Sequence, residues 1–504
     1  MAENLGNITS STASSLRSQW ANPGDILSLL LLIGGDVVQR AIAQLIGCRV
    51  SLPQTRLKLS IAPVAFSFGW VAYGFSNLLS AMGDKRLMPS SEFSSVVVNC
   101  SNGFARETQS WVLSRLLRDH ETRLPIDPRP VEGDGRAESL RIDVFTLQPV
   151  AKPSNDFVWW FGWFVIAAQI GIAISAWVAY GDWGAFAVSI CGNLLVAITC
   201  SLPQWTQEKW AGRKLNKSNV TCLTRGNGSL HIMVFIGTRG SWDMESLARG
   251  ASTPRPETRW VSLGLAFLWI GLLISVSGLK ENAWFLVAIG GIGMLQNAFA
   301  AGTSRRPNAS GFHFTPFPRA PTIIGKREKY VDDEDANVDL DNDLKELSDL
   351  NAWALNRKRK RLAEPVSEID MPRWLDSMSK HDGIPEWLEP VGSGKVNASS
   401  KSTKTQPFDS TKNPQSGVIY ATGVNGALME LEKWVPTAGL AMVQLFFPSS
   451  LSYNDQSIRD NIHKKFWKRA YCTKDIRKRA EEERREEVRN IELEDDDRRE
   501  AEHI

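Results

Sequence analysis

Residues 157–207 read FVWWFGWFVIAAQIGIAISAWVAYGDWGAFAVSICGNLLVAITCSLPQWTQ, and Asp182 is the only charged side chain in this stretch. Two apolar runs, 158–181 and 183–202, flank it. Each is about 20 residues long or more, so a helix of this length crosses the roughly 30 Å hydrocarbon core of a bilayer. The connection Gly181-Asp182-Trp183 is too short for anything except a sharp return. The stretch therefore predicts a transmembrane helical hairpin.

The composition narrows the class of protein. The mean hydropathy is slightly negative despite the apolar runs, so a large polar part accompanies the membrane part. A net charge of +3 over 504 residues gives no indication of a nucleic-acid partner. The six cysteines form no CxxC pair, and neither a disulfide framework nor a metal site is expected. Tryptophans gather at the ends of apolar segments, as they do at membrane interfaces, so the lipid bilayer is the first expected partner.

The first candidate span, residues 25–47, carries polar side chains in its second half. Asp36, Gln39, Arg40 and Gln44 lie on one helix face, and Asp36 and Arg40 form an i,i+4 pair. Charges at membrane depth are costly unless they are paired or face protein. An ion or proton relay is one interpretation of this intramembrane polar pair. A self-neutralised pair packed in the bundle, or a helix end near the headgroups, is the other.

Three further apolar segments complete a prediction of six spans: residues 61–82, 260–279 and 283–302. The last two form a second hairpin through residues 280–282. Small residues are dense in 283–302, which favours close contact with a neighbouring helix.

With six spans, both termini and the two long loops, 84–157 and 203–259, fall on one side. Eleven basic residues near helix ends lie on that side, against four (Arg49, Arg56, Lys58 and Lys280) on the other. This bias places the termini and long loops in the cytosol. A competing signal is a set of N-x-S/T sequons on the same side, which would carry glycans if that side were lumenal: Asn7, Asn99, Asn216, Asn219, Asn227, Asn308 and Asn397.

The long loops have patterns typical of folded structure. Residues 93–99, 140–147, 220–224 and 230–236 predict strands, and the last two are joined by the hairpin signal RGNG at 225–228. Residues 106–119 and 241–248 predict helices. Neither loop can bury a useful core alone, so we expect them to co-assemble into one small α+β module.

The C-terminal part is predicted to be largely disordered, ending in a charged helix. Two candidate partner motifs occur thirteen residues apart, with Trp374 and Leu375 in the first and Trp387 and Leu388 in the second. Near the end, a basic amphipathic helix is predicted around Lys464, Lys465, Phe466, Trp467, Lys468 and Arg469. Such a helix fits a membrane surface or a partner groove, and packing on the protein's own module is the alternative.

The fold class that follows is an α-helical multi-pass membrane bundle of about six transmembrane helices, with a small cytosolic α+β module. The expected organisation is a disordered N-terminal tail (1–24), spans (25–83), a loop (84–157), a hairpin (158–203), a loop (204–259), a hairpin (260–302), a disordered tail with acidic and basic runs (303–416), and an amphipathic segment with a charged helix (417–504).

Four stretches carry a resemblance: 24–41, 61–84, 223–234 and 426–451. They begin GDILSLLLLIGG, IAPVAFSFGW, LTRGNGSLHI and GALMELEKWV, and they are spread over most of the chain. Together they resemble a family of fungal multi-pass integral membrane proteins of uncharacterised function. The resemblance implies membrane residence but no activity, cofactor or catalytic residues.

Motifs for catalysis are absent from the sequence: there is no HExxH, GxSxG or GxGxxG arrangement, and the six histidines are far apart along the chain. No catalytic residue and no cofactor is therefore expected. The first functional hypothesis is a membrane-anchored scaffold whose module and tail bind cytosolic proteins. The second is a channel or transporter using Asp36 and Arg40 together with amides inside spans (Asn77, Gln169, Asn193, Gln296 and Asn297). The third is a membrane enzyme. The sequence does not set the oligomeric state.

Overall fold

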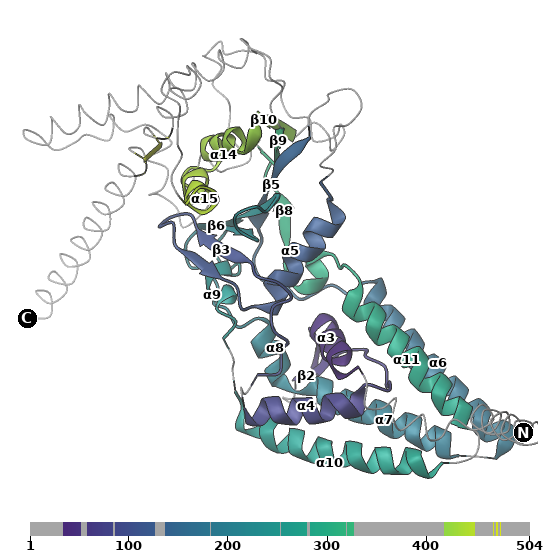
Figure 1. Ribbon diagram of the computed structural model, residues 1–504. Helices are drawn as coiled ribbons and strands as arrows, with labels where there is room; N and C mark the ends of the chain where they lie inside the picture. Colours follow the sequence, from purple (N-terminus) through teal and green to yellow (C-terminus); the bar gives the residue numbers. More distant parts are fainter. Residues whose placement is uncertain are drawn as a thin grey trace, which may run out of the picture.

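The computed structural model describes residues 34–51, 58–83, 86–126, 137–181, 183–251, 254–279, 283–318, 320–326 and 418–448, with Trp467, Ala470, Tyr471 and Lys474. Two parts are distinct in Figure 1, a bundle of helices and a domain built on one β-sheet. The partner motifs at Trp374, Leu375, Trp387 and Leu388 lie outside the described residues.

Four helices are long and apolar enough to cross a membrane: α6 (Phe157–Tyr180), α7 (Gly184–Ser201), α10 (Pro256–Gly278) and α11 (Ala283–Gly302). They coincide with the two predicted hairpins. Helix α6 ends at Gly181, whose φ of 70° is a left-handed conformation that glycine adopts at low cost. Large apolar side chains stay exposed along all four helices, among them Phe157, Trp160, Phe164, Val178, Trp183, Leu194, Trp260, Phe267, Ile274, Trp284 and Leu295.

The second predicted span, 61–82, is not one helix. The chain leaves strand β2 (Lys58–Ile61), continues without helical structure from 62 to 69, and only then forms α4 (Trp70–Met82). Thirteen helical residues reach about 20 Å, which is too short to cross a bilayer. Figure 1 shows α4 lying alongside α10. Hydropathy mispredicted this segment because a non-helical segment buried among helices is as apolar as a span.

The first predicted span is only partly described. Its second half forms α3 (Gly35–Leu45), and residues 25–33 lie outside the described part of the chain. Strand β1 (Cys48–Ser51) follows at once and pairs antiparallel with β2. Among the described residues, four helices have the length and composition needed to cross a membrane, so the prediction of six spans is not confirmed.

The sheet domain has eight strands in the order β10-β9-β5-β7-β6-β3-β4, with β8 also pairing with β5. The two long loops supply β3 (Val96–Asn99), β4 (Ala105–Glu107), β5 (Glu138–Leu147), β6 (Asn219–Thr224) and β7 (His231–Gly237). Strand β3 pairs antiparallel with β6, and β5 pairs parallel with β7. The strands of the two loops thus form one sheet, as expected.

Two C-terminal segments also belong to this domain. The first, 307–326, lies within the predicted disordered tail of 303–416 and corrects that prediction, whereas the second lies in the predicted amphipathic segment of 417–504. Residues 307–326 contain η1 (Pro307–Ser310), β8 (Phe314–Pro316) and β9 (Thr322–Lys326), and β9 pairs with β5. Strand β10 (Val418–Thr422) then pairs parallel with β9. Helices α14 (Gly423–Trp434) and α15 (Ala438–Phe446) follow. The sequence pattern missed β8, β9 and β10 because they are short and lie far from most of the sheet in sequence.

Alternate side chains of the central strands face two different cores. On one face, Ile142, Val144 and Val234 pack with α14 and α15. On the other, Phe235 packs with α5 (Trp111–Arg123), in a core that continues into the helix bundle. Helix α5 begins later than predicted because 105–107 forms β4. Helix α8 (Pro203–Lys209) lies between the two parts, and α9 (Met244–Ala248) lies next to β3 and β4.

Candidate functional site

Amide side chains within the bundle hold the non-helical segment 62–67 in place. From α11, Gln296 accepts a hydrogen bond from the backbone N–H of Ala65 (3.1 Å) and donates one to the carbonyl of Pro63 (3.3 Å). Its neighbour Asn297 donates to the carbonyl of Ala65 (3.3 Å) and to the Ser67 hydroxyl (2.8 Å). Two adjacent residues of one helix thus replace the backbone partners that a helical span provides for itself.

The opposite side of the segment is held by α6 and α7. Gln169 donates to the carbonyl of Phe66 (2.6 Å) and to that of Ile289 (2.8 Å). Asn193 accepts from the N–H of Phe66 (3.3 Å) and donates to the Gln169 side chain (3.3 Å). These amides converge on the backbone of one segment instead of lining a pathway. Asn77 is separate and donates to Ser262 of α10 (3.2 Å).

Glycines make room for this close approach. A Cβ atom on Gly293 would lie 1.9 Å from the carbonyl oxygen of Phe66, and one on Gly162 would lie 2.0 Å from that of Pro63. On Gly290 it would meet the Phe68 ring at 2.1 Å. The small residues of 283–302 were predicted to serve contact between helices. Two of them, Gly290 and Gly293, instead face Phe68 and Phe66 in the non-helical stretch before α4.

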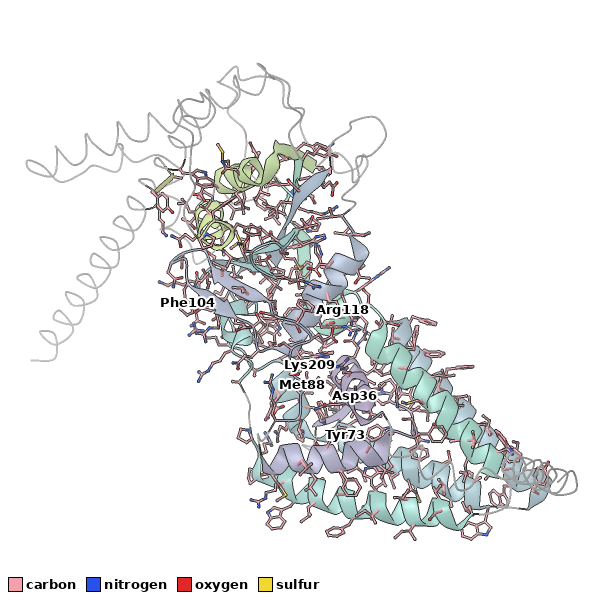
Figure 2. The ribbon with its side chains drawn as sticks, viewed as in Figure 1. Asp36, Tyr73, Met88, Phe104, Arg118 and Lys209 are labelled. Carbon is pink, nitrogen blue, oxygen red and sulfur yellow. The ribbon has the colours of Figure 1, made fainter. Side chains whose placement is uncertain are left out.

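The predicted polar pair is not buried. Asp36 and Arg40 lie on the exposed face of α3, and no ion pair joins the two side chains, both of which the structure describes. Figure 2 shows Asp36 on α3. The prediction of a pair enclosed by helices is therefore wrong. Gln39 and Gln44 of the same helix are instead turned inward, and Gln39 donates to the carbonyl of Leu87 (2.8 Å).

A junction of buried charges joins the bundle to the sheet domain. The guanidinium of Arg305 donates twice to Asp156, at 2.7 Å each, and also to the carbonyl of Gln44 at the end of α3. Asp156 in turn caps α6 by accepting from the N–H of Trp159 (3.1 Å). The N–H of Arg305 donates to Asp119 of α5 (3.0 Å). One arginine therefore connects α3, α6 and α5.

Lys209 is the second cation of this junction. Its ammonium donates to the carbonyls of Gln44 (3.3 Å) and Ile46 (2.8 Å), where the negative end of the α3 dipole lies. Burial lowers the pKa of Lys209 well below its ordinary value, and nearby Arg305 lowers it further. Figure 2 places Lys209 and Met88 between the bundle and the sheet domain.

Helix α5 completes the junction from the domain side. Arg115 donates to the carbonyl of Thr303 (2.8 Å), and Arg118 to that of Gly302 (2.7 Å), both at the end of α11. Both arginines also pair with Glu92, at 2.8 and 3.1 Å. The last turn of one membrane-length helix is thus capped by cations of the sheet domain.

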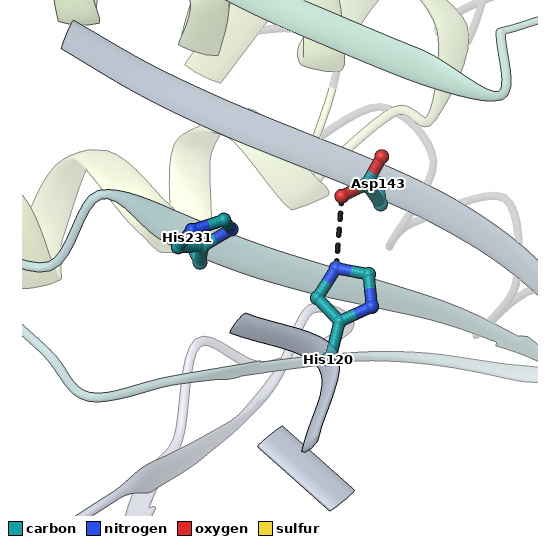
Figure 3. Close-up of side chains that lie close together, drawn as sticks. All are labelled: His120, Asp143 and His231. Atoms are coloured by element: carbon teal, nitrogen blue, oxygen red, sulfur yellow. Dashed lines mark hydrogen bonds and ion pairs between the residues drawn. The ribbon is translucent and has the colours of Figure 1, made fainter. Parts of the chain in front are cut away.

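Inside the sheet domain, three buried side chains form the strongest candidate for chemistry, the His120–Asp143–His231 cluster (Figure 3). His120 lies in the last turn of α5, Asp143 lies on β5, and His231 begins β7. Nε2 of His120 lies 2.9 Å from Oδ2 of Asp143. The rings of His120 and His231 pack edge to face, with centroids 6.0 Å apart. All three side chains are more than nine-tenths buried.

Asp143 is the anionic centre of the cluster. Its carboxylate accepts from the Thr322 hydroxyl (2.7 Å) and from Nε of Arg141 (3.1 Å) as well as from His120. Burial alone would raise the pKa of Asp143, but the hydrogen bond and charge of His120, with Arg141 and Thr322, hold it below its ordinary value. The carboxylate is therefore ionised at neutral pH.

Among the described residues, His231 lacks the side-chain hydrogen bond that His120 makes. Its Nδ1 atom is buried and has no hydrogen-bond partner in the described part of the chain. Burial and the neighbouring His120 lower the pKa of His231 to about 4. The imidazole is therefore neutral near pH 7, with a free lone pair on one ring nitrogen.

The sequence did not reveal this cluster because its members come from three distant segments. The six histidines were judged too dispersed for a metal or a relay, whereas the fold brings two of them together. The parallel register that sets Arg141 opposite His231 places Asp143 on the same face of the sheet. One signal was present in the strand 140–147, where Arg141 and Asp143 put two charges on a single face.

The predicted basic amphipathic helix is described only in part. Trp467 is buried in the sheet-domain core and donates to Asn425 of α14 (3.0 Å). Ala470 is buried in the same core. Lys464, Lys465, Phe466, Lys468 and Arg469 lie outside the described residues. For Trp467, packing on the protein's own domain is what the structure shows.

Comparison with known proteins adds no family to this description. No protein-family model, no curated protein and no solved structure matches the chain. The resemblance to fungal multi-pass membrane proteins stays a prediction.

Proposed function

We propose that this chain is a multi-pass membrane protein that holds a folded α+β domain and a long C-terminal segment against one side of a bilayer, as a docking platform for partner proteins. The junction is the observation that carries the proposal. Arg305 and Lys209 bind the end of α3, and Arg305 also pairs with the capping residue of α6. From the domain, Arg115 and Arg118 of α5 bond to the carbonyls at the end of α11, and Asp119 accepts from Arg305. These contacts fix the domain to the end of a membrane-length helix instead of leaving it on a linker.

Membrane residence is supported by the outer surface of the bundle. The four long helices expose aromatic and aliphatic side chains that would be unfavourable in water over such an area. Trp160, Trp260 and other tryptophans lie near helix ends, where they suit the headgroup region.

We further propose that the sheet domain is cytosolic. A Cβ on Gly47 would lie against Trp210 and Pro153, so strand β1 begins, and its antiparallel partner β2 ends, on the domain side. Arg49, which the six-span topology assigned to the opposite side, then joins the basic side and strengthens the bias. A glycosidase-sensitive gel shift at the sequons Asn99 or Asn227 would contradict this orientation, because it requires a lumenal domain.

The platform is tested by proximity labelling with a ligase fused to the C-terminus of the full chain. We expect a reproducible set of cytosolic neighbours, reduced when Trp374 and Trp387 are both changed to alanine. Trp353→Ala is the matched control, since it removes a tryptophan from the same segment outside the motifs. Absence of reproducible neighbours for the unmodified chain would contradict the proposal.

Transport is a second candidate, favoured by one observation. A non-helical segment followed by a short helix, α4, at the depth of long apolar helices is typical of some transporters and channels. Against it, the amides that could line a path are bonded to the segment itself. A flux assay on the purified protein in liposomes that contain a pH-sensitive dye distinguishes transport from the platform function. Proton or cation flux abolished by Gln169→Leu would favour transport over the platform.

A further inference from the structure

We propose that His120, Asp143 and His231 form a binding site for a divalent transition-metal ion, and that zinc is the ion this donor set suits best. The inference goes beyond the platform function and does not depend on it. One ligand atom from each residue can be chosen so that all three lie within 4.8 Å of one another. Two imidazole nitrogens and one carboxylate are a donor set that zinc uses widely, whereas calcium and magnesium prefer oxygen alone.

A second, independent observation points to a ligand at this place. Nδ1 of His231 is buried and has no hydrogen-bond partner among the described residues, and the residue as a whole is only 7 % exposed. A buried polar atom without a partner destabilises a fold by roughly 1–3 kcal/mol, so such atoms are uncommon in folded proteins. A metal ion bound to Nδ1 of His231 would remove this penalty. Figure 3 shows the His231 ring on the neighbouring strand, beside the His120–Asp143 contact.

The His120–Asp143 distance needs only a small adjustment, and the three ligand atoms already lie within 4.8 Å of one another. In a tetrahedral zinc site with bonds of about 2.1 Å, ligand atoms lie about 3.4 Å apart. Nε2 of His120 and Oδ2 of Asp143, now 2.9 Å apart, would separate by about half an ångström, within side-chain rotation. His120 would then carry its ring proton on Nδ1 and offer the Nε2 lone pair to the ion. Three protein ligands leave the fourth position for water.

The surrounding residues resemble the outer shell of a metal site. Thr322 donates 2.7 Å to Oδ1 of Asp143, the oxygen that does not face His120, and so orients the carboxylate. Arg141 opposes metal binding, because its Nε lies 3.1 Å from Oδ2 of Asp143, the oxygen that would bind the metal. Its side chain is partly exposed, which lets it move toward solvent. Arg141 is therefore expected to limit affinity.

The experiment measures metal binding by the full chain in detergent. The protein is stripped with a chelator and dialysed with Zn²⁺, and the metal content is determined by mass spectrometry. We expect about one ion per chain, and Co²⁺ in its place should give the visible absorption of a tetrahedral N/O site. His231→Gln should weaken binding beyond the roughly 10- to 100-fold that loss of an outer-shell partner costs.

His313→Gln is the matched control. Nδ1 of His313 is also buried and lacks a hydrogen-bond partner in the described part of the chain, yet this residue is not in the cluster. Its replacement should therefore leave the metal content unchanged. Arg141→Gln should tighten binding, a result that a purely structural ion pair would not give.

The proposal is overturned if the unmodified chain binds no Zn²⁺ or Co²⁺ after stripping, or if His313→Gln lowers the content as much as His231→Gln does. Should His231→Gln fail to fold, the Co²⁺ spectrum of the unmodified chain and the Arg141→Gln titration still decide.

Discussion

Arg305 illustrates how much of this structure depends on single buried charges. It bonds to Asp156 and to the end of α3, and its side chain is almost completely buried. Arg305→Met would leave Asp156 and the carbonyl of Gln44 without this partner. Breaking a buried pair in this way costs about 3–5 kcal/mol, because a charge is left uncompensated.

Thermal unfolding of the detergent-solubilised protein measures this loss. Arg306→Met is the control, since Arg306 is the next residue in the chain and is exposed, so a change within about 0.5 kcal/mol is expected. Equal losses for the two variants would show that the junction does not stabilise the fold.

The lowered pKa of Lys209 predicts that the stability of the protein depends on pH in a specific way. Its pKa is lowered in the folded chain by burial and by Arg305, and Asp156 partly opposes this. At pH values between that lowered pKa and about 10.4, the ordinary pKa of lysine, Lys209 is protonated in the unfolded chain and neutral in the folded chain. The lysine's contribution to the free energy of unfolding therefore rises with pH over this interval.

The measurement is chemical unfolding of the unmodified chain and Lys209→Met between pH 7 and pH 10. As the pH rises, the free energy of unfolding of the unmodified chain should increase relative to that of Lys209→Met. A difference that is constant over this range would mean that Lys209 keeps an ordinary pKa.

Two buried thiols give a further prediction at this scale. Sγ of Cys100, directly after β3, and Sγ of Cys222, on the neighbouring strand β6, lie 3.3 Å apart. The hydrogen bond with Cys222 and burial raise the pKa of Cys100, which suppresses the reactive thiolate. A maleimide should label Cys100 and Cys222 only after denaturation, as read by peptide mass spectrometry. Rapid labelling of either in the native protein would show that the β3–β6 edge opens readily.

Among the elements, the non-helical segment 62–67 depends on its glycine neighbours. Gly293→Ala places a methyl group against the Phe66 carbonyl, and backbone on both sides leaves little room to yield. We expect a loss of about 1–3 kcal/mol, the usual cost of overpacking. Gly291→Ala is the matched control on the same helix, because a Cβ there meets no atom within 4 Å. It should be neutral or stabilising by up to about 1 kcal/mol. Equal melting temperatures for the two variants would contradict the close contact.

These elements also show what the sequence could predict. Helices α6, α7, α10 and α11 and strands β5, β6 and β7 were predicted because each is specified by a local pattern of apolar residues. Segment 62–69 was mispredicted because burial against Gly162 and Gly293 makes it as apolar as a span. The pairings β9–β5 and β10–β9, and the approach of His231 to Asp143, depend on contacts between distant residues. No local pattern encodes these contacts.

At the scale of the whole molecule, the C-terminal segment is part of the fold and not only an extension from it. Strand β10 pairs with β9, and α14 and α15 cover the face of the sheet that carries Ile142 and Val234. Truncation after residue 326 should therefore expose this apolar face. We expect the truncated chain to aggregate or to bind a hydrophobic dye strongly, because a large exposed apolar patch favours association.

Replacing residues 330–415 by a Gly/Ser linker of about 30 residues is the informative comparison, since it keeps β10, α14 and α15. A parallel pair such as β9 and β10 needs a connection that returns along the strand length, and this linker is long enough to provide one. The linker variant should elute as a single species at the unmodified melting temperature, while the truncation should not. If both behave alike, β10 and the two helices do not form part of the domain core. If the linker variant folds but loses its proximity-labelled neighbours, folding and partner binding are separate roles of the C-terminal segment.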